Sequence, residues 1–266
     1  MIRRKEWFLG VCSWLGGWAL LLSALGFAVP ARAAGGEADA IPPGSVIAND
    51  DFRHGLALWR AELQDAGSRM SAENGVLDVW ASAGVTLWFR QDLAGDYEIR
   101  FTATPVKASF PGFPDRVSNL NFFWNATTLR GEDPATLNAD GSLNAYNPLQ
   151  LYYVGFGANG NKTTRLRRYD GSPARPQRFG YADAPELTPA DNLGPLPAFA
   201  RLEADTPVRM RVRSVQAASG EPTLQVFAND VSVFSWHDPE PYRHGWFGFR
   251  TTTSHFRLSD FSVVRL

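Results

Sequence analysis

YEIRFTATPV, residues Tyr97–Val106, is the stretch that decides the fold class of this 266-residue chain. Its apolar residues Tyr97, Ile99 and Phe101 alternate with charged or polar residues at the intervening positions. Successive side chains of a strand point to opposite faces, so a period of two is typical of a strand with one buried face. The stretch therefore predicts a half-buried β-strand.

Similar short segments recur along the chain and are separated by Gly, Pro, Asn and Asp. Asn229-Asp230 lies between two of them and predicts a hairpin, and Glu73-Asn74-Gly75 predicts a turn. No segment shows a sustained helical stripe. The other predicted strands are residues 76–80, 85–90, 118–125, 150–156, 163–169, 207–215, 223–228, 231–236, 246–251 and 255–264.

About a dozen strands without helices require a sandwich or a barrel. We therefore predict an all-β fold, a jelly-roll sandwich of two stacked antiparallel sheets, which forms a single domain over residues 48–266. Residues 171–206 are rich in Pro and Ala and predict a long loop, either a wall of a functional site or a surface excursion.

The N-terminus has the pattern of a secretory signal. A basic start is followed by an apolar run over residues 7–29 and by Ala31-Arg32-Ala33, which offers small residues where a signal peptidase reads. An uncleaved anchor is the alternative, since the run is long enough to span a bilayer. We predict a signal peptide over residues 1–33, a flexible lead over 34–47, and a secreted or periplasmic mature chain without a membrane span.

Charge and cysteine content narrow the function classes. Cys12 is the single cysteine and lies in the predicted signal, so the mature chain would have no disulfide or thiol chemistry. Removal of residues 1–33 leaves 22 basic and 26 acidic residues, a net charge of −4. This balance argues against a nucleic-acid partner, which calls for a strongly basic surface.

Three polar stretches, residues 149–169, 115–125 and 245–255, combine tyrosine, asparagine, histidine and arginine. A simple core would not need this mixture, whereas a site for a polar, anionic ligand would. Arginine suits a carboxylate because its planar fork makes two parallel hydrogen bonds. The leading ligand class is therefore an acidic polysaccharide or oligosaccharide.

Several familiar chemistries lack their motifs. The Glu-x-Asp-x-x-Glu strand of sandwich glucanases is absent, and so are the Gly-x-Ser-x-Gly elbow, the His-Glu-x-x-His zinc motif and a phosphate loop. Four histidines and no mature cysteine argue against a catalytic zinc site, and we expect no catalytic metal and no cofactor. A structural calcium ion near Asp50, Asp51 and Asp260 is left open.

The remaining residues suit β-elimination on a uronic acid. This reaction needs a group that neutralises the carboxylate, a base for the neighbouring proton and an acid for the leaving oxygen. Tyr152 and Tyr153 point to opposite faces of one strand, so at most one lines a given cleft. The catalytic candidates are Tyr153, His255 and Arg165; the substrate-binding candidates are Asn119, Asn121, Trp124, Tyr152, Asn161, Arg167 and Arg250.

Each candidate has a structural alternative. Arg165 and Arg167 share one strand face, which could equally be a solvated face, and Trp124 could be core. We favour a secreted polysaccharide lyase. A non-catalytic carbohydrate-binding domain explains the same aromatic and amide residues without a base, and a glycoside hydrolase with dispersed carboxylates is a third reading.

The motifs also carry a family resemblance over residues 48–266. DDFRHGLALWRAE and ENGVLDVWASAGVTLWFRQDLAGDYEIRFTATPV resemble the start of concanavalin A-like domains. DRVSNLNFFW, YYVGFGANGNKTTRLRRY and PYRHGWFGFRTTTSHFRLSDFSV resemble a bacterial family of YesU-like, concanavalin A-type domains. This resemblance implies a lectin- or glucanase-type sandwich and a link with acidic polysaccharides, and it brings no catalytic set.

Overall fold

A computed structural model describes residues 42–183, 192–217 and 220–266. The predicted signal peptide, residues 1–33, and residues 34–41 of the predicted lead lie outside this part of the chain. The first strand, β1, begins at Val46, inside the range predicted as a lead, because it pairs with the last strand of the domain. No helix among the described residues is long and apolar enough to cross a membrane.

The described chain is almost entirely β-structure, as predicted. Its helical elements are single turns: η1 (Pro134–Leu137), η2 (Leu143–Tyr146), α1 (Ala158–Asn161) and η4 (Ala198–Ala200). The strands are β1 (Val46–Asp50), β2 (Trp59–Leu63), β3 (Arg69–Glu73), β4 (Val76–Ala94), β5 (Tyr97–Val106), β6 (Ala108–Phe110), β7 (Phe113–Arg116), β8 (Leu120–Thr128), β9 (Leu149–Gly157), β10 (Thr163–Asp170), β11 (Gln177–Ala182), β12 (Asn192–Gly194), β13 (Val208–Ser214), β14 (Leu224–Ala228), β15 (Val231–Trp236) and β16 (His244–Arg265).

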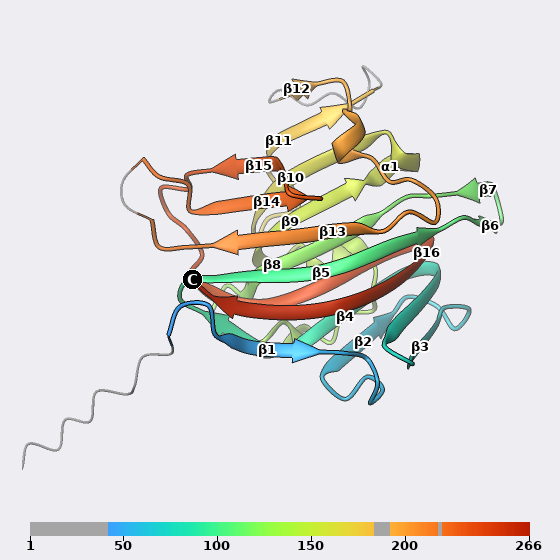
Figure 1. Cartoon of the computed structure of the whole chain (residues 1–266), viewed down its shortest axis with the longest axis horizontal. Helices are drawn as coiled ribbons and strands as arrows, with labels where there is room; N and C mark the ends of the chain where they lie inside the picture. The colour runs from blue at the N-terminus through green and yellow to red at the C-terminus, as the bar shows by residue number, and fades with distance from the viewer. Residues whose placement is uncertain (1–41, 184–191, 218–219) are drawn as a thin grey trace, which may run out of the picture. The chain divides into compact units, whose positions relative to one another are not determined.

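Two long antiparallel strands, β4 and β16, hold the domain together. The first half of β16 pairs with β8, and its second half pairs with β5. From β8 the sheet continues through β9, β10, β11 and β12, which we call the first wing; from β5 it continues through β13, β14 and β15, which we call the second wing. Figure 1 shows the two wings as two layers joined along β4 and β16.

The main core lies between the two wings. Phe101 of β5 contacts Phe122 of β8 and Phe249 of β16, with ring centroids 5.6 and 4.8 Å apart. Further out, Tyr152 of β9 packs edge-on against Trp236 of β15. Since large apolar side chains from both wings meet here, their burial provides the main driving force for the sandwich.

Both predicted turns are tight hairpins. Asn74 and Gly75, between β3 and β4, have φ angles of 53° and 83°, and Asn229 and Asp230, between β14 and β15, have φ angles of 46° and 67°. Two consecutive residues with positive φ are typical of the type I′ turn, whose twist matches that of the flanking strands.

Part of the predicted long loop, residues 171–206, forms strands. β11 and β12 fall within this range, although residues 184–191 lie outside the described part. β11 pairs with the edge of β10, and its Phe179 and Tyr181 pack on Trp236 and Phe234 of the second wing. The Pro- and Ala-rich composition conceals this strand because long-range pairing, rather than local preference, stabilises it.

Candidate functional site

One row of cross-strand partners crosses four strands of the sheet. Arg250 of β16 pairs with Asn121 of β8, Asn121 pairs with Gly155 of β9, and Gly155 pairs with Arg165 of β10. Directly opposed residues of antiparallel strands point to the same face of the sheet. Residues far apart in the chain therefore form one polar row, on the face that turns away from the main core.

The side chain of Tyr153, from the neighbouring row, reaches the middle of the polar row. Tyr153 lies between Phe123 and Arg167, one row further along the strands. A Cβ atom placed on Gly155 would lie only 2.8 Å from the hydroxyl oxygen of Tyr153. The phenol ring therefore leans over Gly155, and its hydroxyl occupies the gap between Asn121 and Arg165.

A cavity of about 290 Å³ opens over these rows. Six of the ten site candidates line it: Asn119, Asn121, Tyr153, Arg165, Arg167 and Arg250. None of its described lining residues is an aspartate or glutamate, whereas five are arginines: Arg116, Arg165, Arg167, Arg175 and Arg250. The cavity thus combines a strong excess of positive charge with amides and a phenol.

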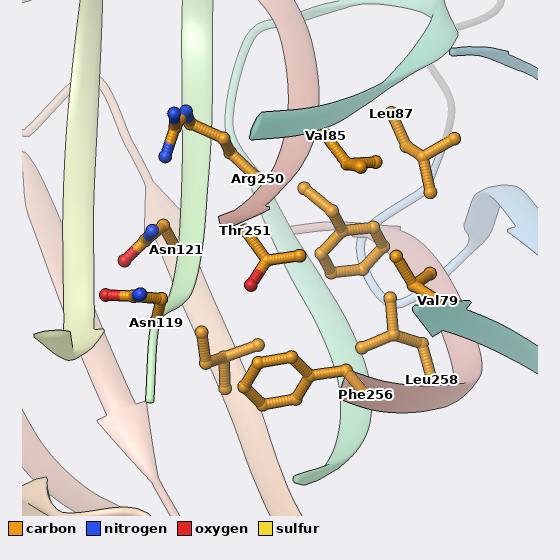
Figure 2. A pocket seen from close by; sticks show the side chains of 11 residues that line it. Val79, Val85, Leu87, Asn119, Asn121, Arg250, Thr251, Phe256 and Leu258 are labelled. Carbon is orange, nitrogen blue, oxygen red and sulfur yellow. The ribbon is translucent and has the colours of Figure 1, made fainter. Parts of the chain in front are cut away.

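Arg250 and Asn121 are buried at the base of this cavity. Their side chains are 5% and 2% exposed, and neither Arg250 Nε nor Asn121 Oδ1 has a hydrogen-bond partner among the described residues. In Figure 2 the side chains of Arg250, Asn121 and Asn119 point to one side, opposite the apolar Val85 and its neighbours around a core cavity of about 20 Å³. A buried, unpaired guanidinium is costly, so this arrangement favours an anionic partner.

Electrostatics at the site has two opposing components. Burial raises the pKa of the Tyr153 phenol, while the nearby cations of Arg250, Arg167, Arg175 and Arg165 act to lower it. Burial dominates, so the phenol is neutral at pH 7. Burial also lowers the guanidinium pKa of Arg250 and of Arg165. Repulsion from Arg167 adds to the shift at Arg165.

A buried carboxylate fixes one wall of the cavity. Leu143 of η2 lines the cavity, and Tyr146 of the same turn donates its hydroxyl to Glu62 Oε2 over 2.6 Å. Trp88 donates its indole N–H to the same oxygen over 3.0 Å, and Arg60 donates to the other carboxylate oxygen over 3.2 Å. Glu62 therefore anchors η2 to the strands beneath it.

His255, a candidate base, is placed outside the cavity lining. Its Nε2 lies 2.9 Å from Asp78 Oδ1, and its ring packs edge-on against Trp80. β16 carries an irregularity between Thr252 and Ser254, which changes the register before His255. The structure therefore separates His255 from the arginines and from Asn121.

Three substrate-binding candidates also lie elsewhere. Trp124 and Tyr152 face the main core, with ring centroids 5.3 Å apart, and Tyr152 donates to Asp238 Oδ2 over 2.6 Å. Asn161 donates its amide to the carbonyl of Leu202 over 2.7 Å and accepts the N–H of that residue. Strand alternation explains why Tyr152 faces the core, because its neighbour Tyr153 points to the opposite face and lines the cavity.

Several site residues were not among the predicted set. Arg116 lies within the polar stretch 115–125, so its type and place could have indicated it. Gly155 follows Tyr153 by two residues on the same strand face, which signals a gap beside the ring. Arg175 and Glu62 gave no such signal, because only long-range contacts bring them to the site.

The calcium site left open by the sequence has no supporting cluster. Among the described residues, no three His, Cys, Asp or Glu side chains are grouped so as to hold a metal ion. Asp50 instead accepts hydrogen bonds from the N–H of Phe52 and from the indole of Trp59, which tie the loop after β1 to the core.

Comparisons with known proteins agree with the sandwich fold. A family model described as "Domain of unknown function (DUF6250)" matches residues 79–261, and no curated protein matches the chain. A Bacillus subtilis protein of unknown function with a galectin-like fold shares 17% identity, with a TM-score of 0.62, over 84% of this chain and 97% of that one.

Two further solved structures are similar to this chain. The potassium-bound carbohydrate recognition domain of Emp46p shares 11% identity, with a TM-score of 0.51, over 84% of this chain and 94% of that one. The alginate lyase Aly36B, solved with an alginate trisaccharide, shares 14% identity, with a TM-score of 0.44, over 85% of this chain and 100% of that one. At 17% and 11% identity, the likeness to the galectin-like protein and to the Emp46p domain shows the fold alone. The predicted lectin-type sandwich is confirmed, and the finer resemblance to YesU-like proteins stays a prediction.

Proposed function

This chain belongs to the DUF6250 family of domains of unknown function, and we propose that it is a carbohydrate-active protein that cleaves a uronate-containing glycan by β-elimination. The cavity over β8, β9 and β10 binds the glycan in this proposal. Its five arginines favour an anionic ligand, and its amides suit sugar hydroxyl groups.

Each residue has a role that its position supports. Arg250 and Asn121 bind the carboxylate and stabilise the negative charge that develops as the neighbouring carbon loses its proton. The Tyr153 phenolate takes that proton, and the electron pair left on carbon forms a double bond as the glycosidic C–O bond breaks. The leaving oxygen then takes the proton from Tyr153, so the enzyme is regenerated without water or an oxidant.

One observation supports this proposal above all. The hydroxyl of Tyr153 occupies the gap over Gly155, in the row between Asn121 and Arg165. A base and its charge-stabilising neighbours must converge on one reacting atom, and this row brings them together.

The test is a lyase assay on a panel of uronate polysaccharides. We expect an ultraviolet-absorbing unsaturated uronate product, activity that rises with pH above neutrality, and a loss of at least about a hundredfold in Tyr153→Phe. The pH dependence follows because burial raises the pKa of Tyr153, so the phenolate becomes populated only as the pH rises. Products with a new reducing end and no unsaturation would establish hydrolysis instead.

The second candidate function is carbohydrate binding without cleavage. The raised pKa of Tyr153 favours it, because a neutral phenol is a poor base at pH 7. The position of His255, hydrogen-bonded to Asp78 outside the lining, also favours it, because no histidine lines the cavity within the described chain. Tight binding of acidic glycans with no turnover at any pH would decide for this function.

A further inference from the structure

The cavity carries more positive charge than a single carboxylate needs. Five arginines line it, and none of its described lining residues is acidic. Like charges at close range destabilise one another unless an anion lies between them. Burial is the main cause that lowers the pKa of Arg165 and of Arg250, and repulsion from Arg167 and from Arg175, respectively, adds to it.

Four of these cations fall into two groups on either side of Gly155. Arg250 lies on β16 beside Asn121 of β8, and Arg165 and Arg167 lie on β10. Three strand spacings separate Arg250 from Arg165, which corresponds to about 14 Å between their Cα atoms. The side chains can therefore approach one ligand from opposite sides, each group facing a different part of it.

Each group is arranged for an anion in its own right. Arg250 is 5% exposed and forms no ion pair among the described residues, and the unpaired Oδ1 of Asn121 can accept a hydroxyl from the same sugar. On the other side, Arg167 donates Nη1 to the carbonyl of Arg175 over 2.7 Å, a contact that brings a second guanidinium to the group without neutralising either.

We propose that the site binds two carboxylates of adjacent uronate residues, one at Arg250 and Asn121 and the other at Arg165, Arg167 and Arg175. The glycosidic bond between the two sugars then lies over Gly155, beside the Tyr153 hydroxyl. This inference rests on the proposed function and sharpens it: the substrate is a glycan with consecutive uronates, rather than one in which uronates alternate with neutral sugars.

The experiment combines changes in the ligand with changes in the protein. Binding is measured by titration calorimetry on the Tyr153→Phe variant, which cannot complete elimination. The ligands are a panel of 1,4-linked diuronates and the same disaccharides in which the carboxyl of one sugar or of the other is reduced to an alcohol. We expect each reduction to weaken binding by about tenfold to a hundredfold, the range for one charge-assisted hydrogen-bonded group.

The arginine variants assign each carboxylate to its group. Arg250→Gln should weaken diuronate binding by a similar factor, and the affinity of this variant should no longer depend on the carboxyl of one sugar. The affinity of Arg167→Gln should no longer depend on the carboxyl of the other sugar. Arg209→Gln, at an exposed position of β13 outside the cavity, is the matched control and should change nothing. If Arg250→Gln fails to fold, Arg250→Lys keeps the charge but loses the planar fork, and should show the same pattern more weakly.

The outcomes separate the two proposals. Tight diuronate binding that survives reduction of either carboxyl would overturn the two-carboxylate inference and leave the proposed function standing. Binding that both arginine variants lower equally, without selectivity between the two reduced ligands, would also overturn it. No binding of any acidic disaccharide would overturn both.

Discussion

At the scale of single residues, the site depends on one missing side chain. Gly155 leaves a gap in an otherwise polar row, and Tyr153, two residues earlier on the same face, fills this gap with its hydroxyl. Any side chain at position 155 would compete with the phenol for this space. The glycine is thus required by close approach of a neighbouring side chain, and it has no positive φ angle that would require it for the backbone.

We expect Gly155→Ala to abolish function while leaving the fold intact. The new Cβ would lie 2.8 Å from the Tyr153 hydroxyl and 3.1 Å from the ring, so the phenol must move. Misplacement of a catalytic group by about 1 Å can cost about a hundredfold in rate. Lyase rates and thermal unfolding, measured together, check this.

Gly67→Ala is the control for that change. Its Cβ would meet the Ser82 hydroxyl at 2.8 Å, outside the cavity lining, so activity should be retained. A Gly155→Ala enzyme with full activity would show that the Tyr153 hydroxyl does not act where the structure places it.

At the scale of elements, the polar row extends beyond the cavity to the edge of the sheet. Arg250 pairs with Thr86 of β4, and Thr86 pairs with Glu62 of β2. Glu62 in turn binds Tyr146 of η2 and Trp88 of β4. One buried carboxylate thus connects two strands with the turn that forms a wall of the site.

We expect Glu62→Gln to destabilise the protein by about 1–3 kcal/mol, because the amide cannot accept from Tyr146, Trp88 and Arg60 together and leaves a buried donor unmatched. Urea unfolding monitored by tryptophan fluorescence measures the change. Glu132→Gln is the matched control: Glu132 pairs with an exposed arginine, so its loss should stay within about 0.5 kcal/mol. Equal effects of the two substitutions would contradict the anchoring role of Glu62.

At the scale of the whole molecule, the sandwich buries several phenols. Burial raises the pKa of four tyrosines well above the ordinary value of 10.0: Tyr97, Tyr146, Tyr152 and Tyr169. The folded protein keeps these phenols protonated at a pH where the unfolded chain loses the protons. Their contribution to stability is therefore fully present below about pH 10 and is lost as the pH rises further.

We expect the free energy of unfolding to fall steeply above pH 10, by up to about 1.4 kcal/mol per pH unit for each buried phenol. Urea unfolding at a series of pH values from neutrality to pH 11.5 measures this slope. Tyrosinate absorbance should appear together with unfolding rather than before it. A stability that stays level between pH 9 and pH 11 would show that these tyrosines titrate freely in the native state.

The sequence by itself determined the fold class, because alternation with a period of two and turn residues are local properties of a chain. Strand alternation also predicted that Arg165 and Arg167 share a face and that Tyr152 and Tyr153 do not. It could not decide which tyrosine faces the cavity, and neither Trp124 nor His255 could be placed, since strand partners and register are long-range properties. Only the tertiary structure aligned Arg250, Asn121, Gly155 and Arg165 in one row, because that row is made by hydrogen-bond register between strands far apart in the chain.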